Sequence, residues 1–283
     1  MYRNLLTFAL AISILAGCSD SGSLEQLRQD GLDAFAEEEY SDARAYFSEG
    51  LKQLPSDRDF LYYIGVSYKR DYMFDSAMVF LKRSALFHKS DREVNLALLE
   101  VAMALEAWDE ALSAIGGLTA AGDTEEMHYL TLATLFGKME YPLNQFTYLY
   151  RYLILHPEDS THYITAANLS MTVDSTHLGV ALMDSAIAYF GELPKYVGTR
   201  AMIFARRGEY ATAELILRDM LVADSTSIGS RMNLAHVLAA QPSKAKKREA
   251  IELFRQLKDV ASGVAPLDSF IVELETELKN WNR

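Results

Sequence analysis

The sequence predicts an all-α solenoid of about seven helical hairpins, closed by a capping helix at the C-terminus. Small residues recur at a spacing of 34 along most of the chain, which indicates a repeated hairpin unit. Glycine and proline number only 15 and 6, too few for a linker-rich or disordered protein. The alanines that share one 34-residue lattice are Ala43, Ala77, Ala111 and Ala213.

The N-terminal segment has the layout of a secretory signal peptide over residues 1–17. Residues 5–16 are apolar and uncharged, with Arg3 in front of them and small residues behind. A membrane-spanning helix needs about 20 apolar residues, so this run is too short to be one. We therefore expect an address that is removed, not a spanning anchor.

The end of this run, Leu15-Ala16-Gly17-Cys18, resembles the lipobox of bacterial lipoproteins. The resemblance implies that Cys18 receives a diacylglyceryl group, and that its new amine is acylated with a fatty acid such as palmitate after cleavage. Several acyl chains anchor a protein stably to a membrane without spanning it. Cys18 is the only cysteine, which excludes an intrachain disulfide. An ordinary signal peptide with a chance cysteine is the alternative.

Ser19, directly after the cysteine, favours an outer-membrane lipoprotein by resemblance to known sorting signals. Aspartate at that place would favour the inner membrane instead. We expect residues 18–23 to be a lipidated tether and the mature protein to face the periplasm. The formal charge of −12 disfavours nucleic acid, because phosphate contacts dominate such binding.

The stretch DGLDAFAEEEYSDARAYFSEGLKQLP carries the repeat pattern most clearly. Gly31 is followed by Tyr40, Ala43, Phe47 and Pro55. This spacing resembles the tetratricopeptide repeat (TPR), whose period is 34 residues. The resemblance implies a right-handed α-solenoid with a concave groove, and it covers residues 24–261.

Three parts of the repeat region depart from a regular lattice. Gln145 replaces the fourth alanine, so we expect that hairpin to pack less tightly. In the fifth unit, Ala181, Ser185 and Ala188 fit the second helix better than Gly179, which predicts a loop about two residues longer. About three residues are inserted before Ala250 in the seventh unit.

Residues 262–283 form the expected capping helix. An apolar stripe at helical spacing consists of Phe270, Leu274 and Leu278. A cap of this kind covers the exposed face of the last hairpin in a solenoid.

No catalytic or metal-binding motif is present in the sequence, so we expect no enzyme, no cofactor and no metal. His156 and His162 flank two acidic residues, but Pro157 between them explains this stretch as a turn that ends a helix. The histidines show no zinc-ligand spacing.

In TPR proteins the first helix of each hairpin lines the concave groove, and fixed places on it point inward. At these places the chain carries aromatic, methionine and basic side chains, with Glu25, Asp59, Glu93 and Glu100 as the acids. Such a surface suits an extended peptide or an amphipathic helix. The candidate groove residues are Arg28, Phe35, Tyr62, Lys69, Arg70, Met103, Lys138, Asn168, Met171, Lys195 and Arg206.

These observations predict a lipid-anchored envelope scaffold that binds one or more envelope proteins through the groove, in the assembly or stabilisation of an envelope complex. The membrane is contacted through the lipid anchor only. The alternative is a solute- or glycan-binding lipoprotein of an outer-membrane uptake system. In that case Trp108 and Trp281 would serve as sugar platforms.

Overall fold

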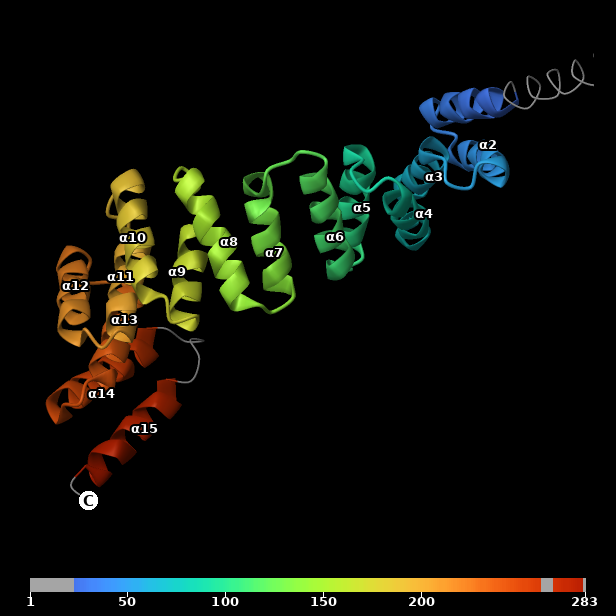
Figure 1. The fold of residues 1–283 in the computed structure, drawn as a ribbon. Helices are drawn as coiled ribbons and strands as arrows, with labels where there is room; N and C mark the ends of the chain where they lie inside the picture. The colour runs from blue at the N-terminus through green and yellow to red at the C-terminus, as the bar shows by residue number, and fades with distance from the viewer. Residues whose placement is uncertain (1–22, 261–266, 282–283) are drawn as a thin grey trace, which may run out of the picture. The chain divides into compact units, whose positions relative to one another are not determined.

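The computed structural model describes residues 23–260 and 267–281, and within these ranges the chain is helical, with no strand. The predicted signal peptide and Cys18 lie outside the described residues, as does most of the tether. The chain divides into two compact units, Met1–His128 and Tyr129–Arg283. Each unit is a stack of helical hairpins, as predicted (Figure 1).

The described part of the first unit, from residue 23 onward, contains three hairpins. Residues 23–36 pair with α2, α3 pairs with α4, and α5 pairs with α6, after which a short 3-10 helix follows. The bounds are α2 Tyr40–Gln53, α3 Arg58–Arg70, α4 Phe74–Phe87, α5 Arg92–Ala104, α6 Trp108–Ala120 and η1 Glu125–His128.

The second unit contains four hairpins and a last helix. Its helices pair as α7 with α8, α9 with α10, α11 with α12 and α13 with α14, and α15 packs on α14. The bounds are α7 Tyr129–Lys138, α8 Pro142–Leu155, α9 Tyr163–Thr172, α10 Thr176–Phe190, α11 Pro194–Arg206, α12 Tyr210–Ala223, α13 Ile228–Ala240, α14 Lys244–Val260 and α15 Leu267–Asn280.

Small residues let the two helices of a hairpin approach closely. A Cβ atom added to Gly31 would lie 2.5 Å from the ring of Phe47, and one added to Gly65 would lie 2.7 Å from Leu81. Both pairs are 16 residues apart, so the contact repeats with the lattice. The four lattice alanines are fully buried, with 0% of their surface exposed. The 34-residue lattice therefore marks the places where helix backbones meet.

The expectation for the fifth hairpin was wrong. Ala181 and Ser185 are exposed, as is Ala188, whereas the lattice residue Gly179 is buried. A Cβ at Gly179 would lie 2.0 Å from Oγ of Ser170 on α9, so only glycine fits this contact. The hairpin keeps the regular register without a longer loop.

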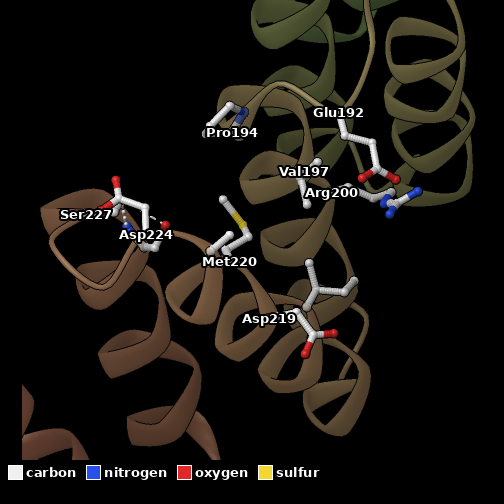
Figure 2. Close-up of a pocket in the computed structure, with 11 residues that line it drawn as sticks. Glu192, Pro194, Val197, Arg200, Asp219, Met220, Asp224 and Ser227 are labelled. Atoms are coloured by element: carbon white, nitrogen blue, oxygen red, sulfur yellow. Dashed lines mark hydrogen bonds between the residues drawn. The ribbon is translucent and has the colours of Figure 1, made fainter.

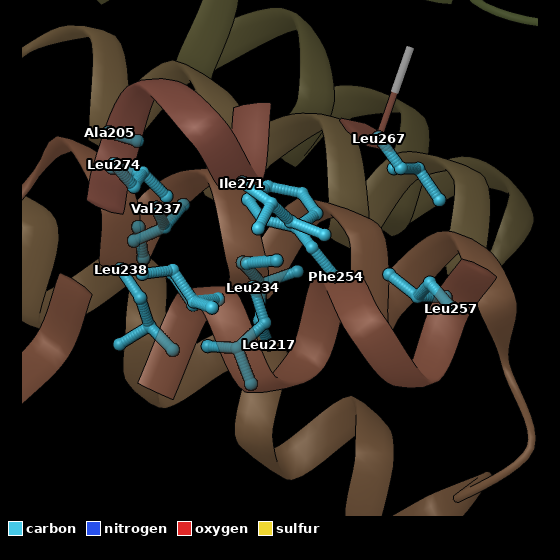
Figure 3. Packing of buried hydrophobic residues seen from close by; sticks show 14 of the residues in the cluster. Ala205, Leu217, Leu234, Val237, Leu238, Phe254, Leu257, Leu267, Ile271 and Leu274 are labelled. Atoms are coloured by element: carbon cyan, nitrogen blue, oxygen red, sulfur yellow. The ribbon is translucent and has the colours of Figure 1, made fainter. Parts of the chain in front are cut away.

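The C-terminal part of the second unit is held by one large apolar cluster (Figure 3). Phe254 and Leu257 of α14 are fully buried, and Leu267, Ile271 and Leu274 of α15 pack against the same cluster. The inserted residues before Ala250 form the short connection between α13 and α14, which leaves Ala250 fully buried.

The turn inside each of the first six hairpins contains one residue with positive φ. These residues lie 34 apart, and five of the six are not glycine. The left-handed conformation costs an L-residue about 1–2 kcal/mol relative to glycine. The six residues and their φ angles are Glu38 (63°), Tyr72 (59°), Glu106 (54°), Glu140 (61°), Asp174 (56°) and Gly208 (81°).

We predict that Glu106→Gly raises the free energy of unfolding by up to about 1 kcal/mol, because relief of the left-handed strain exceeds the extra chain entropy of glycine. Gly208→Glu should lower it by about 1 kcal/mol for the same reason. Urea unfolding followed by circular dichroism measures both changes. Glu106→Ala is the matched control, and a gain as large as that of glycine would contradict the backbone explanation.

Candidate functional site

The candidate site is the surface formed by the first helices of the hairpins. Each of the two units has such a first-helix surface. None of the eleven predicted groove residues is buried in the structure. Arg70, Lys138, Asn168, Lys195 and Arg206 are exposed, and the other six are half-buried. Some of these side chains bind residues of the next hairpin, and others have no such contact.

In the first unit, several predicted groove residues hold the hairpins together. The guanidinium of Arg28 makes two hydrogen bonds to Asp57 (2.9 and 3.2 Å) and one of 2.7 Å to Asp59, while it lies 4.5 Å above the ring of Phe60. Phe35 packs edge-on against Tyr63, with ring centroids 5.3 Å apart. These side chains therefore contribute to the stacking of hairpins.

The same arrangement recurs one hairpin later. Arg58 donates two hydrogen bonds to Asp91 (2.8 and 3.1 Å), one to Glu93, and lies 4.5 Å above the ring of Tyr62. Asp91 also accepts a hydrogen bond from the backbone of Val94, so it caps the start of α5. Arg92 in turn binds Asp123 at 3.0 Å.

The ion pairs of Arg28 with Asp57 and of Arg58 with Asp91 form a ladder between the hairpins of unit 1. In this ladder the arginines favour the ionised forms of the two aspartates. The Arg58 guanidinium holds the pKa of Asp91 below its usual value. Burial would raise the pKa of Asp57, but hydrogen bonds from Arg28 and the backbone of Phe60 outweigh it and lower the pKa. Lys69 pairs with Glu100 of the next first helix. The acidic residues of this surface are therefore neutralised within the unit.

A hollow lies on the first-helix surface of the first unit, at the end of α3. Lys69, Arg70 and Glu100 line it together with Tyr72, and its volume is about 340 Å³. Arg70 makes no ion pair with another described residue. The structure thus brings Lys69 and Arg70 into one hollow, but the charge of Lys69 is already compensated. Met103, half-buried on α5, does not line this hollow.

The first-helix surface of the second unit is different, and we call it the inner surface of unit 2. It carries two hollows of about 330 Å³ each. The first, at the start of α11, is lined by Ile164, Lys195, Gly198, Thr199, Asn233 and neighbouring residues. The second, at the end of α11, is lined by Met171, Met202, Ala205, Arg206, Tyr210, His236, Val237 and Ala240. We call them the Lys195 hollow and the Arg206 hollow.

The ring of His236 lines the Arg206 hollow. Its ring packs edge-on against Phe254 and Phe270, at centroid distances of 5.2 and 5.0 Å. Burial lowers the pKa of His236. The imidazole is therefore neutral at neutral pH and contributes apolar and polarisable surface.

The structure brings together three of the predicted residues of this unit, Met171 and Arg206 in one hollow and Lys195 in the other. Asn168 and Lys138 are exposed but line neither hollow. Tyr210 was not predicted, because it lies on α12, a second helix, whereas the predicted groove is formed by first helices.

The histidine-rich loop forms a turn. The carboxylate of Asp159 accepts hydrogen bonds from the hydroxyl of Tyr152 (3.0 Å) and the backbone of Thr161 (2.8 Å), and lies 2.8 Å from Nδ1 of His162. Burial opposes ionisation, but these bonds lower the pKa of Asp159 to about 2. Within residues 23–260 and 267–281, no group of three or more His, Cys, Asp or Glu side chains is placed to hold a metal.

No helix in the described part of the chain is both long and apolar enough to cross a membrane.

Comparison with known proteins gives structural matches only. No family model and no curated protein matches the chain. The structure of Naa15/Naa10 bound to HypK-THB is similar over 89% of this chain, with 14% identity and a TM-score of 0.62. This chain spans 39% of the length of that one, and the likeness shows the fold alone.

Two further tetratricopeptide repeat structures also match. A tetratricopeptide repeat protein from Parabacteroides merdae is 12% identical, over 90% of this chain and 99% of that one, with a TM-score of 0.44. YrrB, described as a TPR protein with an unusual peptide-binding site, is 13% identical over 65% of this chain and 95% of its own, with a TM-score of 0.47.

We predict that Asp91→Asn lowers the free energy of unfolding by about 1–3 kcal/mol at pH 7, because Asn keeps the helix cap but loses the charged bonds to Arg58. The pKa of Asp91 is lowered in the folded state, so its charge stabilises the fold above the usual value of 3.8 and that contribution is lost as the pH falls further.

The difference between the wild type and this variant should therefore shrink below about pH 4. Urea titrations at several pH values measure it. Asp75→Asn, in the first turn of α4, is the control for a generic loss of charge. A difference that stays constant from pH 7 to pH 3 would rule out the charged bond as the cause.

Proposed function

We propose that this tetratricopeptide-repeat protein is a lipid-anchored adaptor of the bacterial cell envelope, which binds a protein partner on its first-helix surfaces. The observation that carries the proposal is the inner surface of unit 2. There, methionines and two cations line hollows that no other part of the described chain fills. Surfaces rich in methionine and arginine are typical of protein-binding sites.

A scaffold role without catalysis fits the chemistry of this surface. The titratable groups near the hollows are Lys195, Arg206, His236 and Tyr210, and no nucleophile among them is paired with a base. The stacked hairpins supply a rigid frame, which reduces the entropy lost when a partner binds.

The cell-envelope location rests on the sequence. Residues 1–17 are proposed to be the signal peptide, and Cys18 the acylated residue that holds the protein at the periplasmic face of the outer membrane. An anchor of this kind raises the local concentration of the adaptor near membrane partners.

We predict that Cys18→Ala moves the protein from the membrane fraction to the soluble fraction, because no acyl chain can then be attached. Metabolic labelling with a palmitate analogue should mark the wild type and not this variant. Ser19→Ala is the control and should keep both label and membrane association. Persistence of Cys18→Ala in washed membranes would contradict the lipid anchor.

The adaptor role is tested by affinity capture from detergent-solubilised envelopes, with the full chain as bait. Charge reversal on the first-helix surface, Arg206→Glu in unit 2 or Arg70→Glu in unit 1, should remove a specifically retained protein. Arg248→Glu, on the exposed side of α14, is the matched control. If all three baits retain the same proteins as the wild type, the first-helix surfaces are not the binding site.

A further inference from the structure

The inner surface of unit 2 lacks carboxylates. The protein has 39 acidic residues and a net charge of −12. None of the acidic side chains that the structure describes lines the Lys195 hollow or the Arg206 hollow. In a strongly acidic chain, this surface is therefore electrostatically distinct from its surroundings.

The two exposed cations that line these hollows have no acidic partner among the described residues. Lys195 and Arg206 are both exposed, and neither forms an ion pair with another described residue. Lys195 extends over the ring of Tyr196, with Nζ 4.6 Å from the centroid. They lie eleven residues apart on α11, which corresponds to about 16 Å along a helix axis. A small anion cannot bridge that distance, whereas a peptide chain can.

The floor between and around the cations is apolar and adaptable. Met171 and Met202 are half-buried and line the Arg206 hollow, and Ile164 lines the other. Methionine side chains adjust their shape to different apolar partners. Each hollow, at about 330 Å³, has room for one or two apolar side chains of a ligand.

Three other hollows of the described chain each have at least one carboxylate in their lining. A cavity of about 400 Å³ adjoins the Lys195 hollow and shares Pro194, Met220, Ser227 and Ser230 with it. The carboxylates of Glu192, Asp219 and Asp224 belong to this adjoining cavity and not to the Lys195 hollow (Figure 2). In unit 1, Glu100 lines the hollow that contains Lys69 and Arg70. The Lys195 and Arg206 hollows differ from these three in having a cation and no carboxylate in their lining, which favours an acidic ligand there.

We propose that the inner surface of unit 2 binds an acidic peptide segment of a partner protein. Apolar side chains of the segment enter the two hollows, and its carboxylates bind Lys195 and Arg206. This inference rests on the adaptor function proposed above and specifies the chemistry of the partner.

The test uses the full chain in detergent and a fluorescein-labelled peptide of about 14 residues, with Leu at helical spacing and Glu at the remaining places. Fluorescence anisotropy measures binding. A charge-inverted peptide with Lys in place of Glu should bind at least about tenfold more weakly, since its charges face Lys195 and Arg206. An acidic peptide with Ser in place of Leu should also bind weakly, because it lacks apolar anchors.

Variants then locate the site. Lys195→Glu and Arg206→Glu should each weaken binding of the acidic peptide by about fivefold to tenfold. Arg206→Lys should retain most of it, because the charge is kept. Arg248→Glu is the matched charge reversal outside the surface and should leave binding unchanged. The circular dichroism melting curves of all variants check that they are folded.

Equal or tighter binding of the charge-inverted peptide would overturn the inference while leaving the adaptor function intact. So would unchanged affinity of the folded Arg206→Glu and Lys195→Glu variants. An envelope partner that is lost with Arg70→Glu and kept with Arg206→Glu would place the interaction in unit 1, and thereby also refute this inference alone.

Discussion

The close approach of the two helices within each hairpin is the constraint on which the structure depends. Glycine opposite a large side chain, as in Gly31 with Phe47 and Gly65 with Leu81, sets the distance between the two backbones. Once that distance is fixed, the apolar side chains of one hairpin meet those of the next, because a single hairpin cannot bury its own faces. The first helices then lie side by side, and their remaining faces become the surface that is open to a ligand.

The regular part of this pattern could be predicted from the sequence, and the irregular part could not. The alanine lattice identified four fully buried positions correctly. The prediction for the fifth hairpin was wrong because α10 is rich in small residues on several faces, so Ala181, Ser185 and Ala188 were expected to fit better than the lattice residue Gly179. Only the contact with Ser170 on α9 distinguishes them, and that contact depends on three-dimensional packing.

Gln145 illustrates a compensation that single positions do not reveal. A Cβ at Gly137 would lie 2.4 Å from Nε2 of Gln145, so the absent side chain of Gly137 leaves room for the larger residue. The backbone conformation of the turns could not be predicted from the residue types either. Their left-handed residues recur every 34 positions, but Glu, Tyr and Asp occupy five of the six, and these residue types do not identify such a conformation.

The positions of the candidate surface could be predicted from the sequence. Which of its cations are paired with acids and which are unpaired could be learned only from the structure. In the sequence, Arg28, Lys69, Lys195 and Arg206 look alike. In the structure, Arg28 and Lys69 bind acids of the next hairpin, whereas Lys195 and Arg206 have no such partner. The pairing follows from the stacking of hairpins, since the partners are about one repeat apart and are not neighbours in the sequence.

This division also indicates which charges the fold needs. A cation that stabilises the fold has a carboxylate within about 4 Å, as in the ladder of unit 1, because screening weakens interactions beyond roughly 8 Å at physiological salt. Neither Lys195 nor Arg206 forms an ion pair within 4 Å with a described carboxylate, so their charges contribute little to the stability of unit 2. Their charge has its largest effect on a molecule that enters the hollows. The charges on the first helices therefore serve two purposes, cohesion between hairpins in unit 1 and recognition of a ligand in unit 2.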